Sequence, residues 1–127
     1  MRKSLTVFYV ADQEMSSQFY EAVLGFEPVL NVPGMTEFRL NNGSSLGLMP
    51  ERGIKNLLGD LLPDPARGSG IPRAELYLIV DNAAQYHERA IAAGAKEMSA
   101  LDQRGWGDRV AYSLDPDGHM LAFAESS

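Results

Sequence analysis

Hydrophobic and polar positions near the start of the chain follow first a strand pattern and then a helix pattern. Residues 5–10 (Leu-Thr-Val-Phe-Tyr-Val) are β-branched and aromatic, which predicts a largely buried strand. Asp12 follows as a helix N-cap, and apolar residues recur at helical spacing through 15–24. Gly25 stands where that helix should end, because glycine adopts the left-handed conformation that closes many helices.

The next segment predicts a β-hairpin. Residues 35–40 and 45–49 read as two strands, and Asn42-Gly43 between them is a strong hairpin-turn signal. The first part of the chain therefore has the order strand, helix and then two or three strands.

The second half of the chain repeats this order. Its predicted elements are a strand at 75–80, a helix at 84–93 between Asn82 and Gly94, and strands at 109–114 and 120–124 joined by a turn at 115–118. Asp12 corresponds to Asn82 with an offset of 70 residues, and Gly43 corresponds to Gly118 with an offset of 75. A repeat that tolerates small length changes in its loops predicts a duplicated βαβββ unit.

We therefore expect an α+β fold with two βαβββ modules in tandem. The chain, 1–127, is expected to form one domain, with module 1 at about 4–50, a connector at about 51–73 and module 2 at about 74–125. The stretch 50–73 contains four prolines and four glycines, and we expect a short helix within it at 54–62.

Composition narrows the classes of function. The chain has 127 residues, 45% of them hydrophobic, and a net charge of −6, which works against binding to nucleic acid or anionic membranes. It has no cysteine, which excludes disulfides, thiolate metal sites and a cysteine nucleophile. No apolar run approaches the ~20 residues that a membrane helix needs, and the N-terminus does not read as a signal peptide, so we expect a cytoplasmic location by default.

Two motifs, one in each module, resemble those of the vicinal oxygen chelate superfamily, which includes glyoxalase I, extradiol dioxygenases and bleomycin-resistance proteins. Residues 17–26 (SQFYEAVLGF) resemble the family's "FYxxvLGF" signature, and residues 115–119 (DPDGH) resemble its "DPDGN" turn. The resemblance covers nearly the whole chain. It implies that the modules form a curved mixed sheet around a concave pocket and that the protein is a homodimer.

Metal-dependent members of that family hold a divalent ion with four side chains, two from each module. The corresponding positions here are Leu5, Gly47, Glu75 and Ala122. Glu75 is the one possible ligand among them, and a single carboxylate does not satisfy a divalent cation, so we expect neither a metal site nor a cofactor. His87 is expected to be a solvated helix residue and His119 a surface residue of the turn.

Strand alternation divides the side chains into two faces. One is uniformly apolar and should pack under the helices; the other is mixed in size and includes Tyr9, Met49, Glu75, Tyr77 and Met120. We expect these five residues to line a site for a flat organic ligand, together with Phe38 and Tyr112. Phe38 and Tyr112 occupy matching places in the two modules, and the alternation does not assign their face. The alternative is that the same residues fill a collapsed core or a dimer interface.

Trp106 is the only tryptophan and lies between two glycines in a loop, where an indole is well placed to stack on a ligand. The alternative is a lid residue that covers an apolar edge. Arg39, Arg104 and Arg109 are possible partners for an acidic ligand, although an ordinary surface charge is the simpler interpretation of each.

The leading hypothesis is a metal-independent protein that binds a small, partly aromatic molecule, similar to the bleomycin-resistance branch, and protects by sequestering it, as in antibiotic resistance. One alternative is an enzyme, either a glyoxalase-like lyase or isomerase or a dioxygenase-type catalyst, with a non-standard or metal-free site. In that case burial beside Tyr77 and Ile79 would raise the pKa of Glu75 and make it a general base. A second alternative is an accessory domain whose pocket is vestigial.

Overall fold

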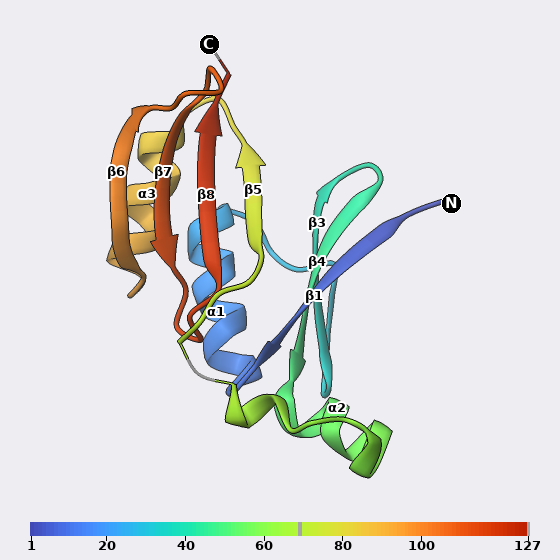
Figure 1. Ribbon diagram of the computed structural model, residues 1–127. Coiled ribbons are helices and arrows are strands. Elements are labelled where there is room, and N and C mark those ends of the chain that lie inside the picture. Colours follow the sequence, from blue (N-terminus) through green and yellow to red (C-terminus); the bar gives the residue numbers. More distant parts are fainter. Residues whose placement is uncertain (69, 127) are drawn as a thin grey trace. The chain divides into compact units, whose positions relative to one another are not determined.

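The computed structural model describes residues 1–68 and 70–126, and its internal contacts divide the chain into two compact units (Figure 1). Unit 1 comprises Met1–Glu21 and Gly25–Ser69, and unit 2 comprises Ala22–Leu24 and Gly70–Ser127. Each unit contains a four-stranded mixed sheet, and the two sheets have the same strand order. The expected α+β class and the tandem βαβββ modules are confirmed.

The first module has the expected order of elements. They are β1 (Ser4–Val10), α1 (Gln13–Leu24), β2 (Leu30–Val32), β3 (Met35–Asn41) and β4 (Ser44–Pro50), and the sheet order is β1-β4-β3-β2. The Asp12 side chain caps α1 by accepting a 3.0 Å hydrogen bond from the Met15 amide, and Gly25 ends the helix at a φ of 84°. Both caps agree with the sequence prediction.

One face of the unit 1 sheet forms an apolar core. Leu46 and Leu48 of β4 are completely buried, as is Val10 of β1, and the Phe8 ring contacts Tyr20 of α1 with ring centres 6.4 Å apart. The alternation predicted for these strands is therefore correct.

The second module repeats the arrangement. Its elements are β5 (Glu75–Ile79), α3 (Ala83–Ala92), β6 (Lys96–Gln103), β7 (Arg109–Leu114) and β8 (Met120–Glu125), in the sheet order β5-β8-β7-β6. Helix α3 packs on one face of this sheet and lies behind it in Figure 1. The contact includes Phe123 of β8 and Tyr86 of α3, whose ring centres are 5.8 Å apart. Within the residues that the structure describes, the opposite face of the sheet carries no helix of its own module.

The connector contains more structure than the sequence predicted. Helix α2 spans Glu51–Leu58, and 3-10 turns follow at Gly59–Leu61 and Pro65–Arg67. The helix begins three residues before the predicted start at 54, with Pro50 at its N-cap and the acidic Glu51 in its first turn, where negative charge is favourable. None of the helices within the described residues is long and apolar enough to span a membrane.

The expectation that His87 is a solvated helix residue is wrong. Its exposed fraction is 7%, because α3 turns this side chain toward β6, where Nε2 lies 2.8 Å from a carboxylate oxygen of Glu97.

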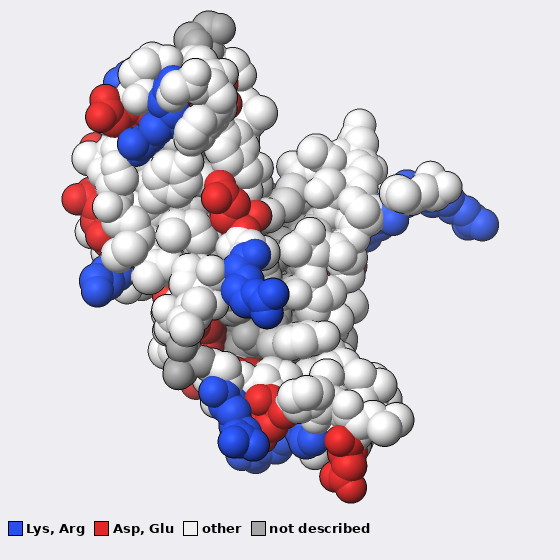
Figure 2. Space-filling model, in the orientation of Figure 1, with Lys and Arg blue, Asp and Glu red and all other residues white. Residues whose placement is uncertain are grey.

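On the face shown in Figure 2, acidic and basic groups are interspersed among larger uncharged areas.

Candidate functional site

The face of the β5–β8 sheet opposite α3 carries three side chains at one register. Tyr77 of β5 pairs with Ala122 of β8, and Ala122 pairs with Tyr112 of β7. Phe123 points toward α3, so its neighbour Ala122 and both tyrosines point the other way. Ala122 is completely buried, and the two half-buried tyrosines pack against it and its buried neighbours. We call Tyr77, Ala122 and Tyr112 the aromatic row.

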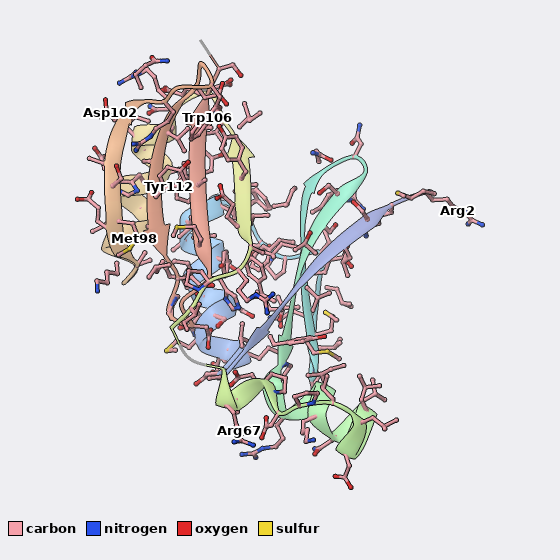
Figure 3. All side chains as sticks on the ribbon, in the orientation of Figure 1. Arg2, Arg67, Met98, Asp102, Trp106 and Tyr112 are labelled. Atoms are coloured by element: carbon pink, nitrogen blue, oxygen red, sulfur yellow. The ribbon has the colours of Figure 1, made fainter. Side chains whose placement is uncertain are left out.

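Trp106 is held at this row by a chain of hydrogen bonds. Its indole N–H donates to the Tyr77 hydroxyl at 3.0 Å, and that hydroxyl donates to a carboxylate oxygen of Asp108 at 2.5 Å. Burial, followed by the bond to Asp108, raises the pKa of Tyr77 above its ordinary value, so the hydroxyl keeps its proton at neutral pH. Trp106 nevertheless has 61% of its surface exposed, which leaves the indole open for stacking. Trp106 and Tyr112 are both labelled on the second module in Figure 3.

A tight hairpin between β6 and β7 presents these groups. The Arg104 amide donates to the Asp108 carbonyl at 2.8 Å, and the Gly107 amide donates to the Arg104 carbonyl at 3.2 Å. Gly107 adopts a φ of 107°, a conformation that a side chain would strain. The glycines that flank Trp106 in the sequence therefore form a short, hydrogen-bonded turn with the indole near its tip.

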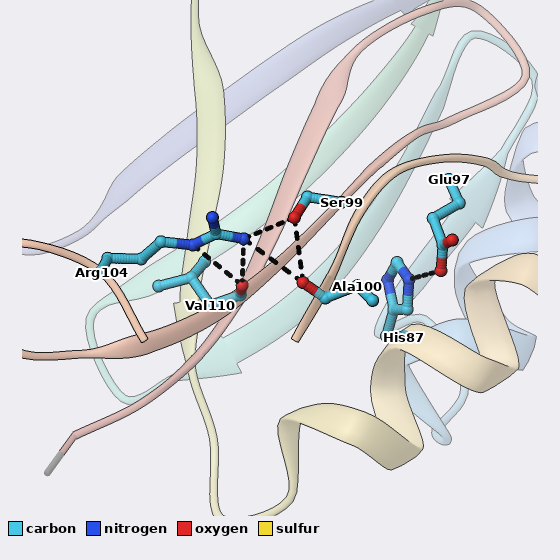
Figure 4. Close-up of polar contacts among 6 residues, drawn as sticks. All are labelled: His87, Glu97, Ser99, Ala100, Arg104 and Val110. Atoms are coloured by element: carbon cyan, nitrogen blue, oxygen red, sulfur yellow. Dashed lines mark hydrogen bonds and ion pairs between the residues drawn. The ribbon is translucent and has the colours of Figure 1, made fainter. Parts of the chain in front are cut away.

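Arg104 lies beside the aromatic row and is half-buried, so it is not the ordinary surface charge that was the simpler interpretation. Its guanidinium carbon is 5.2 Å from the centre of the Tyr112 ring. Four hydrogen bonds fix the guanidinium: one to the Ser99 hydroxyl at 2.6 Å, one to the Ala100 carbonyl at 3.3 Å, and two to the Val110 carbonyl at 2.8 and 3.3 Å (Figure 4). Arg109 differs, because it lies on β7 with Glu125 3.7 Å away.

Glu75 and Met120 form the next pair along the same face. Met120 is half-buried and Glu75 is exposed, so the burial that the general-base hypothesis assumed for Glu75 is not found. Burial first, and the Glu75 carboxylate second, raise the pKa of Tyr112. Unit 2 therefore brings five predicted site residues to one face: Glu75, Tyr77, Trp106, Tyr112 and Met120.

Two further predicted site residues lie in unit 1. Tyr9 of β1 pairs with Met49 of β4, and both keep exposed surface, 39% for Tyr9. The same face of the unit 1 sheet carries Glu37 of β3, which forms an ion pair with Lys3. This ion pair lowers the pKa of Glu37. Glu37 was not among the predicted site residues, although the alternation of β3 places it on the face opposite the core-facing Phe38.

Phe38 does not lie on the face of the unit 1 sheet that carries Tyr9 and Glu37. It is completely buried and packs against Phe26 with ring centres 6.3 Å apart. The matching of Phe38 with Tyr112 is wrong by one residue, because Phe38 pairs with Leu46 whereas Tyr112 pairs with Ala122. A one-residue shift moves a strand side chain to the other face of the sheet.

A cavity of about 730 Å³ lies elsewhere, in unit 1, along the first turns of α1. One of its polar lining residues, Gln13, is hydrogen-bonded to the segment 32–36. Gln13 donates to the Val32 carbonyl at 2.8 Å and to the Thr36 hydroxyl at 2.9 Å, and it accepts from the Gly34 amide at 3.0 Å. These bonds anchor the β2–β3 turn to α1, and the cavity holds none of the predicted site residues.

Comparison with known proteins agrees with the architecture. The family model described as the glyoxalase/bleomycin resistance protein/dioxygenase superfamily matches residues 4–123. The chain belongs to this superfamily. A comparison with curated proteins gave no match.

Solved structures similar to this superfamily member come from several bacteria. A glyoxalase/bleomycin resistance protein/dioxygenase family enzyme from Burkholderia phytofirmans has a TM-score of 0.82 at 20% identity, over 98% of both chains. A glyoxalase-related enzyme from Fulvimarina pelagi has a TM-score of 0.80 at 24% identity, over 97% of this chain and 86% of its own. A protein from Agrobacterium tumefaciens solved by NMR has 26% identity and a TM-score of 0.76, over 100% of this chain and 98% of its own. These likenesses establish the fold.

The divalent metal that the superfamily resemblance implies does not fit the donors present. Leu5, Gly47 and Ala122 offer no side-chain ligand, and Glu75 has Met120 as its strand partner. Among the described residues, neither the unit 1 face that carries Tyr9 nor the unit 2 face that carries Tyr77 supplies by itself the three or four ligands that a tightly bound zinc or manganese ion takes.

A cluster of ligand-type side chains occurs within the described residues at the β7–β8 turn, where Asp115, Asp117 and His119 come within 4.8 Å of one another. The Asp115 carboxylate accepts from the amides of Asp117 and His119 at 2.9 and 2.8 Å and lies 2.8 Å from His119 Nδ1. His119 is therefore half-buried and part of the turn, not the surface residue that was expected. This cluster stabilises the turn.

Proposed function

We propose that this superfamily member is a metal-independent binding protein, and that the aromatic row with Trp106 binds a small, flat, partly aromatic organic molecule. The observation that carries the proposal is the fixed but exposed indole. Trp106 is oriented by its bond to Tyr77, and Tyr77 is oriented by Asp108, while most of the indole surface remains open. A pre-oriented aromatic side chain loses little entropy when a ligand stacks on it.

The rest of the open face suits the same ligand. Tyr112 and Met120 extend the apolar surface, and Glu75 lies at its exposed end, where a carboxylate accepts a hydrogen bond from a donor on the ligand. Sequestration of a toxic compound, as in the bleomycin-resistance proteins of this superfamily, is the biological role we infer from such a site. Tyr9 and Met49 provide a second apolar surface in unit 1, which we also expect to contribute to ligand binding.

The main alternative, an enzyme with Glu75 as general base, has less support. A carboxylate becomes an effective base near neutral pH when burial or a neighbouring charge shifts its affinity for protons, and Glu75 is exposed. The donor set described above also lacks the ligands for metal-assisted chemistry on either open face.

Tryptophan fluorescence tests the proposal directly, because Trp106 is the only tryptophan. We expect a panel of naphthalene, indole and quinoline derivatives to include ligands that quench its emission. Calorimetry should then show that Trp106→Ala weakens binding at least about tenfold, as loss of an aromatic anchor commonly does. Ile91→Ala is the control, because Ile91 lies on α3, which packs against the opposite face of the sheet.

Two results would count against this site. One is a panel that never changes Trp106 emission, and the other is a bound ligand whose affinity ignores Trp106→Ala. A Glu75→Gln variant that still binds the ligand but loses a measurable turnover would favour the enzyme.

A further inference from the structure

Arg104 is a half-buried cation that forms no ion pair within the described residues. Its charge therefore differs in setting from that of Arg109, which lies near Glu125. The groups that hold Arg104 are a hydroxyl and backbone carbonyls, and these satisfy N–H donors without neutralising a full positive charge.

The hydrogen bonds of Arg104 also leave one nitrogen uncommitted. Nε donates to the Val110 carbonyl, and Nη2 donates to that carbonyl, to the Ser99 hydroxyl and to the Ala100 carbonyl at 3.3 Å. Nη1 takes part in none of the hydrogen bonds within the described residues (Figure 4). The side chain is thus held rigidly on one side and has two N–H donors available on the other.

The position of this nitrogen connects it with the proposed ligand site. The guanidinium lies over the Tyr112 ring of the aromatic row, and Arg104 belongs to the same hairpin as Trp106. A flat molecule seated on Tyr112 and Trp106 therefore lies beside a pre-oriented positive charge. Because the surroundings are partly desolvated, that charge attracts an anionic group more strongly than an arginine in open water does.

The chemistry of the site favours a carboxylate over a phosphate. One nitrogen with two N–H groups matches a single oxygen or one edge of a carboxylate, whereas phosphate is usually held by several cations or amides. Glu75 on the same face and the net charge of −6 further oppose a dianion.

We propose that the ligand is an aromatic carboxylic acid and that Arg104 binds its carboxylate through Nη1. This inference rests on the proposed function, because it assigns the chemical class of the molecule bound at the aromatic row. It also assigns Arg104 a role in specificity: the arginine separates aromatic acids from neutral aromatic molecules of the same shape.

The test compares matched ligands on matched variants. Calorimetry with 2-naphthoate and with the neutral 2-naphthalenemethanol should show that the wild-type protein prefers the acid by about tenfold or more, as expected for a charge-assisted hydrogen bond. Arg104→Gln should abolish this preference, so that the acid and the alcohol bind with affinities within about twofold of each other. Arg104→Lys should retain part of the preference, and Arg109→Gln should retain all of it. Thermal melts of each variant check that the fold persists.

The outcomes separate the two proposals. Equal affinities for acid and alcohol in the wild-type protein, with Trp106 quenched by both, would overturn the assignment of Arg104 and leave the aromatic site standing. A preference for the acid that persists in Arg104→Gln would likewise overturn the assignment of Arg104 and leave the aromatic site standing. Failure of both probes, and of the wider aromatic panel, to bind would overturn the proposed function and this inference with it.

Discussion

Phe38 offers a sharp test of the division between core and ligand site. The sequence pattern suggested a ligand-binding residue, whereas the structure buries its ring completely, against Phe26. Phe38→Ala removes a fully buried ring and leaves a cavity next to Leu46, its partner on β4. Truncations of this kind cost about 3–5 kcal/mol. That is a large part of the roughly 5–15 kcal/mol by which domains are stable.

For a chain of this length each kcal/mol corresponds to about 3–4 °C in Tm, so Phe38→Ala should lower the Tm by roughly 10–20 °C. Circular dichroism measures the melt, and quenching of Trp106 measures binding, which should change less than about twofold below the transition. Phe26→Ala is the control: it loses the same ring contact, but Phe26 is 40% exposed, so its Tm should fall much less. A Tm within 3 °C of wild type, or a tenfold loss of affinity in a folded Phe38→Ala protein, would refute this reasoning.

Three further outcomes are expected. Light scattering at micromolar concentration should give a homodimer of twice the 13.9 kDa chain, as is common in the superfamily, and particles of one chain mass would contradict this. After loading with Zn²⁺, Ni²⁺ or Mn²⁺ and dialysis, the protein should retain less than one metal ion per chain. Stoichiometric retention that is lost in Glu75→Gln would instead support the metalloenzyme hypothesis. Lys3→Ala should lower the free energy of unfolding at pH 7, because the ion pair lowers the folded-state pKa of Glu37. The stabilisation by this pair is present above the unfolded-state pKa of Glu37 and is lost as the pH falls through the folded-state pKa. An equal loss of stability at pH 7 and at pH 2 would exclude this cause.

The elements that the sequence predicted are those in which burial produces a pattern. The end of β1 alternates between buried and exposed residues, β4 and β8 are apolar and buried along most of their length, and α1 has a side-chain cap and a glycine stop. The sequence left β2 undecided and gave no pattern for β6, because these edge strands are largely exposed along their length. A strand that packs neither face shows no alternation, and only its neighbour's hydrogen bonds define it.

The site was predictable in composition and not in geometry. Alternation placed Tyr77 and Met120 on the open face, and the flanking glycines marked Trp106 as a loop residue. The bonds from Trp106 to Tyr77 and from Tyr77 to Asp108 join residues 29 and 31 positions apart, so they depend on how the β6–β7 hairpin returns beside β5. The setting of Arg104 depends on the same hairpin and on carbonyl partners, which side-chain patterns do not reveal.

The two modules have the same strand order but different side chains at matching positions of their sheets. In unit 2 the small central residue of the row, Ala122, lies between Tyr77 and Tyr112. The matching position in unit 1 is Gly47, whose strand partners are Val7 on one side and Glu37 on the other. A Cβ added to Gly47 would come within 3.2 Å of the Val7 side chain, so the space in front of Gly47 is already filled by this aliphatic neighbour.

At matching strand positions, unit 2 therefore has the rings of Tyr77 and Tyr112, whereas unit 1 has the aliphatic Val7 and the ion-paired carboxylate of Glu37. Glu37 is neutralised by Lys3, whereas Arg104 near the aromatic row has no acidic partner within the described residues. An uncompensated charge beside exposed aromatic surface suits a ligand, and a compensated charge beside aliphatic surface suits packing. This contrast is why we assign the main part of ligand recognition to the second module.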